Sequence, residues 1–188
     1  MERRSFVVGS AVSMGMLVAG CAGPSTPSEQ AAKRREIDAG VDSALTQLYA
    51  KTPGSRELVA KSRGQLVFPN VIAAGFVVGA QSGDGALRSG GRTVGYYRTT
   101  SGSFGLQAGA ESKAIIILFM TQDSYNQFVN SNGWTAGADA SVTMVQVGAA
   151  GQVDTNTVNA PVIGFVQTNG GLMANLSLAG TKVTKLDV

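Results

Sequence analysis

The sequence of 188 residues contains no histidine and a single cysteine, Cys21. The lack of histidine excludes a Ser-His-Asp or Cys-His triad, a histidine general base and a histidine metal site. The single cysteine excludes a disulfide within the chain. Acidic residues are few and form no paired motif such as Asp-x-Asp, so the sequence assigns no catalytic residue, no metal ligand and no cofactor. These absences favour a protein that is not an enzyme.

Charged residues are also scarce, at 14% of the chain, and the formal net charge is only +3. That balance predicts no nucleic-acid partner. The length and the 44% hydrophobic content suffice for one domain with a core. The 25 glycines suit strands, tight turns and close backbone packing, so we expect a β-rich body.

The N-terminal segment has the layout of a signal peptide, with Arg3 and Arg4 followed by an apolar run over residues 7–18. About twelve apolar residues are too few to span a hydrocarbon core, which needs roughly 20. Small residues stand directly before Cys21, as in a lipoprotein cleavage site. The sequence therefore predicts a lipoprotein signal peptide over residues 1–20, with Cys21 as the acylated first residue of the mature protein.

An acylated Cys21 makes a membrane the predicted partner, because two or more acyl chains (such as palmitate) anchor a protein stably. Arg3-Arg4-Ser5-Phe6 resembles a twin-arginine signal, so twin-arginine and general secretory export both stay open. The segment is similar to those of Gram-negative lipoproteins, and Ala22 after the cysteine then implies sorting to the outer membrane. We expect a place in the bacterial cell envelope, facing the periplasm.

Residues 22–29 are small, polar and proline-containing, which predicts a flexible tether behind Cys21 and a single domain over residues 30–188. From about Gln30 to Lys51, apolar residues recur at helical spacing and predict an amphipathic helix. Their positions are Ile37, Val41, Ala44, Leu45 and Leu48. Pro53 and Gly54 end this pattern, and Ser55 is positioned to cap a second short helix through about Lys61.

After Gly64 the periodicity changes to that of short antiparallel strands. The predicted strands are residues 65–68, 75–81, 92–98, 104–110, 113–120, 141–147, 161–167, 172–178 and 181–186. A helix over about 122–129 has Thr121 or Asp123 as its cap, and Asn169-Gly170-Gly171 predicts a hairpin turn. The predicted fold is α+β, with an N-terminal amphipathic helix and short helices packed on a curved antiparallel β-sheet or partly closed barrel.

The glycine-rich segment from Gly75 to Gly85 invites comparison with a phosphate-binding loop, but it lacks the Lys-Ser/Thr pair of that motif. Strand, turn, strand is the favoured interpretation, in which the glycines relieve crowding where strands bend or backbones approach closely. Asp84 is then expected in an Asx turn rather than holding a hard cation. A hydrolase that uses carboxylates alone, Asp84 and Glu111, is a weaker hypothesis.

Lys33, Arg34 and Arg35 precede the apolar part of the first helix, beside the predicted anchor. Basic residues there could contact anionic phospholipid headgroups, each contributing about 1 kcal/mol. The alternative is a solvated helix face, which the acidic residues Glu36, Asp38 and Asp42 favour. The aromatic residues Tyr96, Tyr97, Phe104 and Trp134 are expected in the core rather than around a ligand pocket.

Several ordered blocks resemble the SYLF domain family, and together with the preceding helix they span about residues 35–186. The blocks are Gly64–Val71, Gly75–Gly85, Val94–Tyr97, Ser103–Ala110, Asn132–Trp134 and Gly170–Gly180. The resemblance implies a lipid- or membrane-binding domain that in some eukaryotic members bundles actin, although actin is not expected in a periplasmic compartment. The leading hypothesis is thus a non-enzymatic lipid-binding domain of an envelope lipoprotein. The alternative is a structural envelope protein that binds a protein or glycan partner through its glycine-rich strands.

Overall fold

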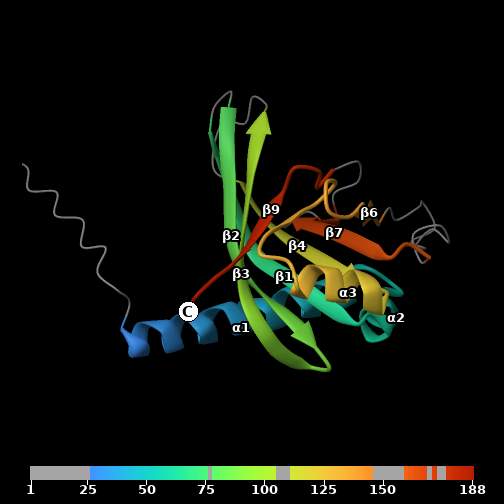
Figure 1. The fold of residues 1–188 in the computed structure, drawn as a ribbon, viewed down its shortest axis with the longest axis horizontal. Coiled ribbons are helices and arrows are strands. Elements are labelled where there is room, and N and C mark those ends of the chain that lie inside the picture. The colour runs from blue at the N-terminus through green and yellow to red at the C-terminus, as the bar shows by residue number, and fades with distance from the viewer. Residues whose placement is uncertain (1–25, 76–77, 105–110, 146–158, 169–170, 173–176) are drawn as a thin grey trace, which may run out of the picture.

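A computed structural model of the chain describes residues 26–75, 78–104, 111–145, 159–168, 171–172 and 177–188. The predicted α+β class is confirmed: a long N-terminal helix packs on a curled, mainly antiparallel sheet (Figure 1). The signal peptide and Cys21, which are predictions from the sequence, lie outside the described residues.

The first helix, α1 (Pro27–Lys51), begins three residues before its predicted start, so residues 27–29 of the predicted tether are helical. A capping box explains the early start. The Glu29 backbone N–H donates to Thr26 Oγ1 at 3.3 Å, and the Thr26 N–H donates to the Glu29 carboxylate at 2.7 Å. Pro27 then occupies the first turn, where its missing N–H is not needed. The five predicted apolar positions of α1 are all buried.

The second helix, α2 (Ser55–Lys61), corrects one prediction, because its N-cap is Gly54 and not Ser55. Gly54 has a φ of 80°, a left-handed conformation that glycine adopts without strain. The buried Ser55 hydroxyl donates to the Thr52 carbonyl at 2.6 Å and lies 3.2 Å from the Leu48 carbonyl. Ser55 therefore closes the end of α1 rather than capping α2.

Within the described residues, nine strands form one open sheet in the order β5-β9-β3-β2-β1-β4-β7-β6, with β8 paired to β7. The strands are β1 (Gly64–Gly75), β2 (Val78–Ser89), β3 (Arg92–Phe104), β4 (Glu111–Phe119), β5 (Trp134–Thr135), β6 (Thr143–Met144), β7 (Val162–Thr168), β8 (Gly171–Leu172) and β9 (Lys182–Lys185). The β6–β7 pair is parallel and the other pairs are antiparallel. The antiparallel pairing of β7 with β8 confirms the predicted hairpin, whose residues 169–170 are not described.

The third helix, α3 (Gln122–Val129), has its predicted bounds and is capped by Thr121, whose side chain accepts from the Ser124 N–H. Two predicted strands fall partly outside the described residues. In the predicted strand 141–147, the described residues 141, 142 and 145 lie outside β6 (Thr143–Met144), and residues 146–147 are not described. In the predicted strand 172–178, Leu172 pairs, residues 173–176 are not described, and residues 177–178 are not in a strand. Conversely, β1 and β3 extend well beyond their predicted ends.

The predicted turn at Ser82–Gly85 is wrong, because these residues lie inside β2. Their partner strand β1 has an irregular register between Val67 and Ile72, the mark of a β-bulge. A Cβ on Gly83 would lie 2.7 Å from the Asn70 carbonyl oxygen, and one on Gly85 would lie 2.2 Å from that of Val67. The two glycines are needed where the bulged strand comes close, which confirms the close backbone approach expected of them, but they do not form a turn.

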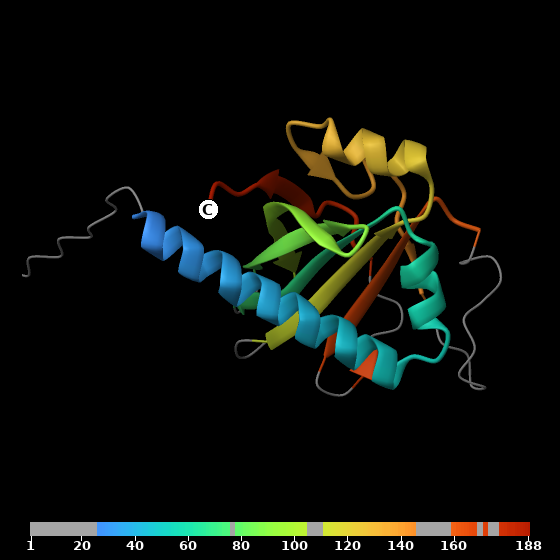
Figure 2. The ribbon, with the colours of Figure 1, turned by 90° about the horizontal axis from the view of Figure 1, so that it is seen from below.

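Alternate residues of the strands build a separate core on each face of the sheet. Figure 2 shows α1 crossing one face, while α3 covers the other. The α1 face is aliphatic, with Val67, Ile116, Leu118 and Ile163 under the helix, and Phe165 as its one fully buried aromatic. The α3 face holds Phe119, Phe128 and Trp134, with Tyr97 and Tyr125 against them.

Candidate functional site

A groove of about 600 Å³ runs between α1 and the α1 face of the sheet. Its volume is in the range of small-molecule sites. Residues of six elements line it: Lys33, Glu36, Ile37, Gly40, Ser43, Ala44 and Gln47 of α1; Pro69, Asn70 and Ile72 of β1; Ser82, Gly83 and Asp84 of β2; Arg98 of β3; Ser112, Lys113 and Ala114 of β4; with Gln167 and Thr168 of β7. The lining is mixed, because polar side chains surround a few aliphatic ones.

The bulge in β1 sets one wall of the groove, because it brings Pro69 against α1. A Cβ on Gly40 would lie 2.8 Å from the Pro69 ring, so only glycine permits this approach of helix and strand. Beside Pro69, Asn70 Oδ1 accepts a hydrogen bond from the Ser112 hydroxyl at 2.6 Å, which joins β1 to β4. In the bulged strand, Pro69 therefore makes the close contact with α1, and Asn70 adds a polar group to the edge of the groove.

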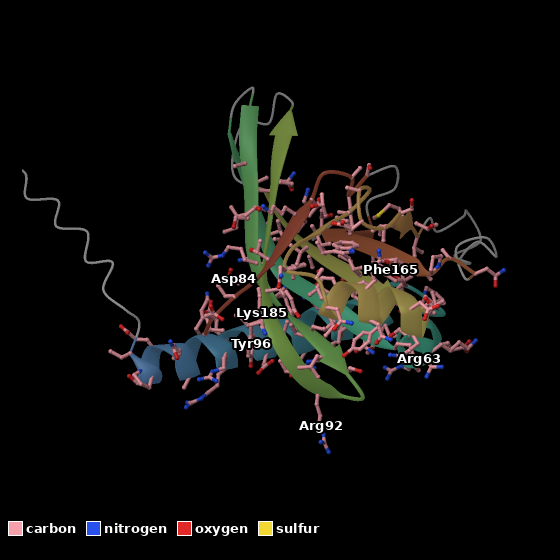
Figure 3. The ribbon with its side chains drawn as sticks, viewed as in Figure 1. Arg63, Asp84, Arg92, Tyr96, Phe165 and Lys185 are labelled. Atoms are coloured by element: carbon pink, nitrogen blue, oxygen red, sulfur yellow. The ribbon has the colours of Figure 1, made fainter. Side chains whose placement is uncertain are left out.

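An ion cluster closes the groove toward β3, where Asp84, labelled in Figure 3, lies between two basic side chains. Arg98 donates to both Asp84 carboxylate oxygens, at 2.7 and 3.1 Å. Lys33 Nζ lies 3.5 Å from Asp84 Oδ2 and 3.3 Å from Glu36 Oε2. Lys33 therefore links α1 to β2 through charge.

The protonation of Asp84 follows from these contacts. Partial burial by itself would raise the pKa of Asp84, but the hydrogen bonds and charges of Arg98 and Lys33 outweigh it and hold that pKa below its ordinary value. The same contact raises the pKa of Arg98. Asp84 is therefore ionised at neutral pH and offers no proton to a substrate.

Gln167 is the least satisfied polar side chain of the groove. It stands on the α1 face of β7, opposite Ala114 of β4, and is only 4% exposed. Neither its amide oxygen nor its amide nitrogen has a hydrogen-bond partner among the described residues. An unpaired buried polar group lowers the free energy of unfolding by about 1–3 kcal/mol. This amide therefore either destabilises the fold or forms part of a binding site.

The predicted headgroup residues differ in their surroundings. Lys33 is half-buried and held by Asp84 and Glu36, whereas Arg34 and Arg35 are exposed. Neither arginine forms an ion pair with a described residue. The sequence predicted the same headgroup contact for Lys33, Arg34 and Arg35. Of these three residues, Arg34 and Arg35 are available to an external anion.

The predicted acidic residues of α1 also have structural partners. Asp38 accepts from the hydroxyls of Thr93 and Tyr96 at 2.7 and 2.9 Å, and Arg88 reaches Asp42. Burial, followed by the Asp38 contact, raises the pKa of Tyr96. These contacts fasten α1 to β2 and β3. The acidic residues therefore do not simply dilute a basic helix face.

The aromatic residues expected in the core lie on both faces of the sheet. Trp134 is buried on the α3 face and Tyr97 packs there with its ring centroid 5.0 Å from that of Phe128, as predicted. Tyr96 packs at the edge of the α1-face core instead. The side chain of Phe104 is outside the described part of the structure.

The carboxylate-hydrolase hypothesis finds little support at Asp84, whose oxygens are occupied by Arg98 and Lys33. The side chain of Glu111 is not described. Among the described residues, no group of three or more histidine, cysteine, aspartate or glutamate side chains could hold a metal ion. No described helix is long and apolar enough to cross a membrane.

Sequence reasoning missed Arg98 and Gln167, for different reasons. Arg98 was missed because the predicted strand ended at residue 81, whereas β2 continues to Ser89 and pairs Asp84 with Arg98. Gln167 gave no signal, since a glutamine near the end of an apolar strand is ordinary in sequence. Its importance lies only in its burial beneath α1.

Comparison with known proteins gives a family match for the C-terminal part of the chain. No curated protein matches the chain. A family model described as Las17-binding protein actin regulator, Ysc84, matches residues 100–187, from the last part of β3 through β9. These residues include the β4 and β7 walls of the groove, whereas α1, β1 and β2 precede them. The resemblance to the SYLF family seen in the sequence is thereby confirmed over residues 100–187, where the chain is similar to the Ysc84, or SYLF, domain.

Proposed function

We propose that this chain is a non-enzymatic lipid-binding domain of an envelope lipoprotein, held at a membrane by acylated Cys21 and contacting anionic headgroups through the start of α1. The family is one of binding domains, which supports a binding role in place of catalysis. The observation that carries the proposal is the pair Arg34 and Arg35, which are exposed and without ion-pair partners in the described structure.

The position of these arginines supports a membrane contact. The capping residue Thr26 follows Cys21 by five residues, so an anchored Cys21 keeps the first turns of α1 near the bilayer surface. Figure 2 shows this end of α1 extending beyond the sheet, at the end opposite to α2. Two basic residues at about 1 kcal/mol each strengthen binding to an anionic surface by roughly thirtyfold.

Vesicle co-sedimentation tests the proposal. A protein of residues 22–188 retains every described residue and carries no signal peptide. We expect it to bind phosphatidylglycerol-containing vesicles, to release them at high salt, and to bind phosphatidylcholine vesicles poorly. Arg34→Ala/Arg35→Ala should weaken the binding strongly, and adding Lys33→Ala should weaken it little further.

The matched control changes two exposed basic residues at the other end of the domain, Lys61→Ala and Arg63→Ala. Equal losses in both double variants would show that only net charge matters and would contradict a headgroup surface on α1. Failure to bind any vesicle would leave the acyl anchor as the sole membrane contact. The search would then turn to protein and glycan partners in the envelope.

The alternative of a partner bound through the glycine-rich strands has less support. Gly83 and Gly85 are buried and face the bulge of β1, so packing accounts for them. They are therefore not free to form an open surface for a ligand.

A further inference from the structure

The groove between α1 and the sheet holds a buried polar group that no described residue satisfies. Gln167 lines the groove, is 96% buried, and has neither a donor nor an acceptor partner for its amide among the described residues. The outer torsion of a glutamine is broad, so the amide can turn toward a bound molecule at small cost. A complementary ligand group must accept one hydrogen bond and donate another, as another amide does.

The charges around the groove favour an uncharged ligand. Three basic and two acidic side chains line it, which nearly balances. Asp84 is held by Arg98 and Lys33, and Glu36 pairs with Lys33. A charged ligand would have to be desolvated there or break these pairs, and either step is costly.

The remaining lining distinguishes between amide-bearing ligands. No aromatic side chain is among the described residues that line the groove, so it offers no flat surface on which a sugar ring could stack. Ile37, Ala44 and Ala114 provide aliphatic walls that suit small apolar side chains. Ser43 and Gln47 add hydrogen-bonding groups along the α1 side.

We propose that this groove binds a short uncharged peptide segment, and that Gln167 pairs its side-chain amide with a backbone amide of that segment. The site lies on the side of α1 that faces the sheet and does not use Arg34 or Arg35. It is therefore independent of the membrane contact proposed above, and each can fail without the other.

Ligand-observed NMR with the purified full chain tests the proposal, with N-acetyl-trialanine amide as the probe and N,N′-diacetylchitobiose as an amide-bearing sugar for comparison. Gln167→Leu removes the amide and keeps the size of the side chain. Ala114→Leu fills the groove and leaves the amide in place. Gln122→Leu, at an exposed position on α3, is the matched control.

We expect the peptide to bind the wild-type chain and the Gln122→Leu variant, and to bind Gln167→Leu and Ala114→Leu at least about tenfold more weakly. Gln167→Leu should also melt at a higher temperature than the wild type, because it removes an unpaired amide. If that variant does not fold, the Ala114→Leu result decides. Unchanged peptide affinity in both groove variants, binding of the sugar in place of the peptide, or no binding of the peptide to the wild type would each overturn the proposal.

Discussion

The two faces of the sheet are built from alternate residues of the same strands, yet they differ in character. The α3 face is closed by an aromatic cluster in which Phe128 lies within 5.7 Å of Tyr97, Phe119 and Trp134, centroid to centroid. The α1 face changes along its length from an aliphatic core to a polar groove with ion pairs and an unpaired amide. One face therefore supplies mainly stability, while the other combines stability with a surface that can bind.

Truncating the aromatic cluster should give the largest effect. Phe128→Ala removes a ring that is 2% exposed and leaves a cavity that no neighbour can fill, so we expect a loss of about 3–5 kcal/mol in the free energy of unfolding. Urea denaturation measures it. Ile37→Ala, beside the groove, should cost about 2 kcal/mol, because water can enter the space that it leaves. Equal losses would contradict the contrast between the two faces.

The next largest effect is expected where the bulged strand β1 pairs with β2. Gly85→Ala places a methyl group 2.2 Å from the Val67 carbonyl oxygen, so the strands must separate. We expect a loss of about 1–3 kcal/mol in the free energy of unfolding. Gly102→Ala in β3 is the control, since a Cβ there meets no atom within 4 Å. If Gly85→Ala left the free energy of unfolding unchanged, close packing against β1 would not be the reason for this glycine.

Asp84 in the groove should make a smaller contribution to the free energy of unfolding, and this contribution should depend on pH. The pKa of Asp84 is lower in the folded protein than in the unfolded chain. Its contribution is therefore complete above the unfolded pKa of about 4, and is lost as the pH falls through the lower folded value. Asp84→Asn should cost about 1 kcal/mol or less at pH 7, because the ion pairs are partly solvated.

Denaturation from pH 7 to pH 2 measures this dependence. The difference between the wild type and Asp84→Asn should shrink as the pH falls below about 4. Asp187→Asn, which removes a carboxylate from an exposed position, is the charge-matched control. A difference that persists at the lowest pH would mean that Asp84 stabilises the fold through its shape and not through its charge.

The smallest effect is expected at the exposed arginines. Arg34→Ala and Arg35→Ala should each change the free energy of unfolding by less than about 0.5 kcal/mol, because neither side chain has an ion-pair partner in the described structure. Thermal unfolding without lipid measures this. A clear loss of stability would show that the arginines serve the fold and would weaken their assignment to a membrane.

Much of the fold could be predicted from local patterns. The apolar spacing of Ile37, Val41 and Leu48 was enough for α1, since a helix repeats its face every 3.6 residues. Thr121 with the following polar residues was enough for α3. For the glycines from Gly75 to Gly85 the sequence predicted both a turn and close backbone approach. The turn was wrong and the close approach was right at Gly83 and Gly85, and only the partner strand distinguishes the two. The predicted anchor at Cys21 stays a prediction.

The sequence by itself determined the helices, the antiparallel strands and the resemblance to a family of binding domains, because each depends on residues close in the chain or on ordered blocks. Only the tertiary structure decided which basic residues are free. It pairs Lys33 of α1 with Asp84, which stands 51 positions later, and leaves Arg34 and Arg35 exposed. It likewise gives meaning to Gln167, which a helix more than a hundred residues earlier in the chain helps to bury and whose amide has no partner among the described residues. Pairing and burial across such separations depend on the packing of α1 on the sheet, which no local pattern encodes.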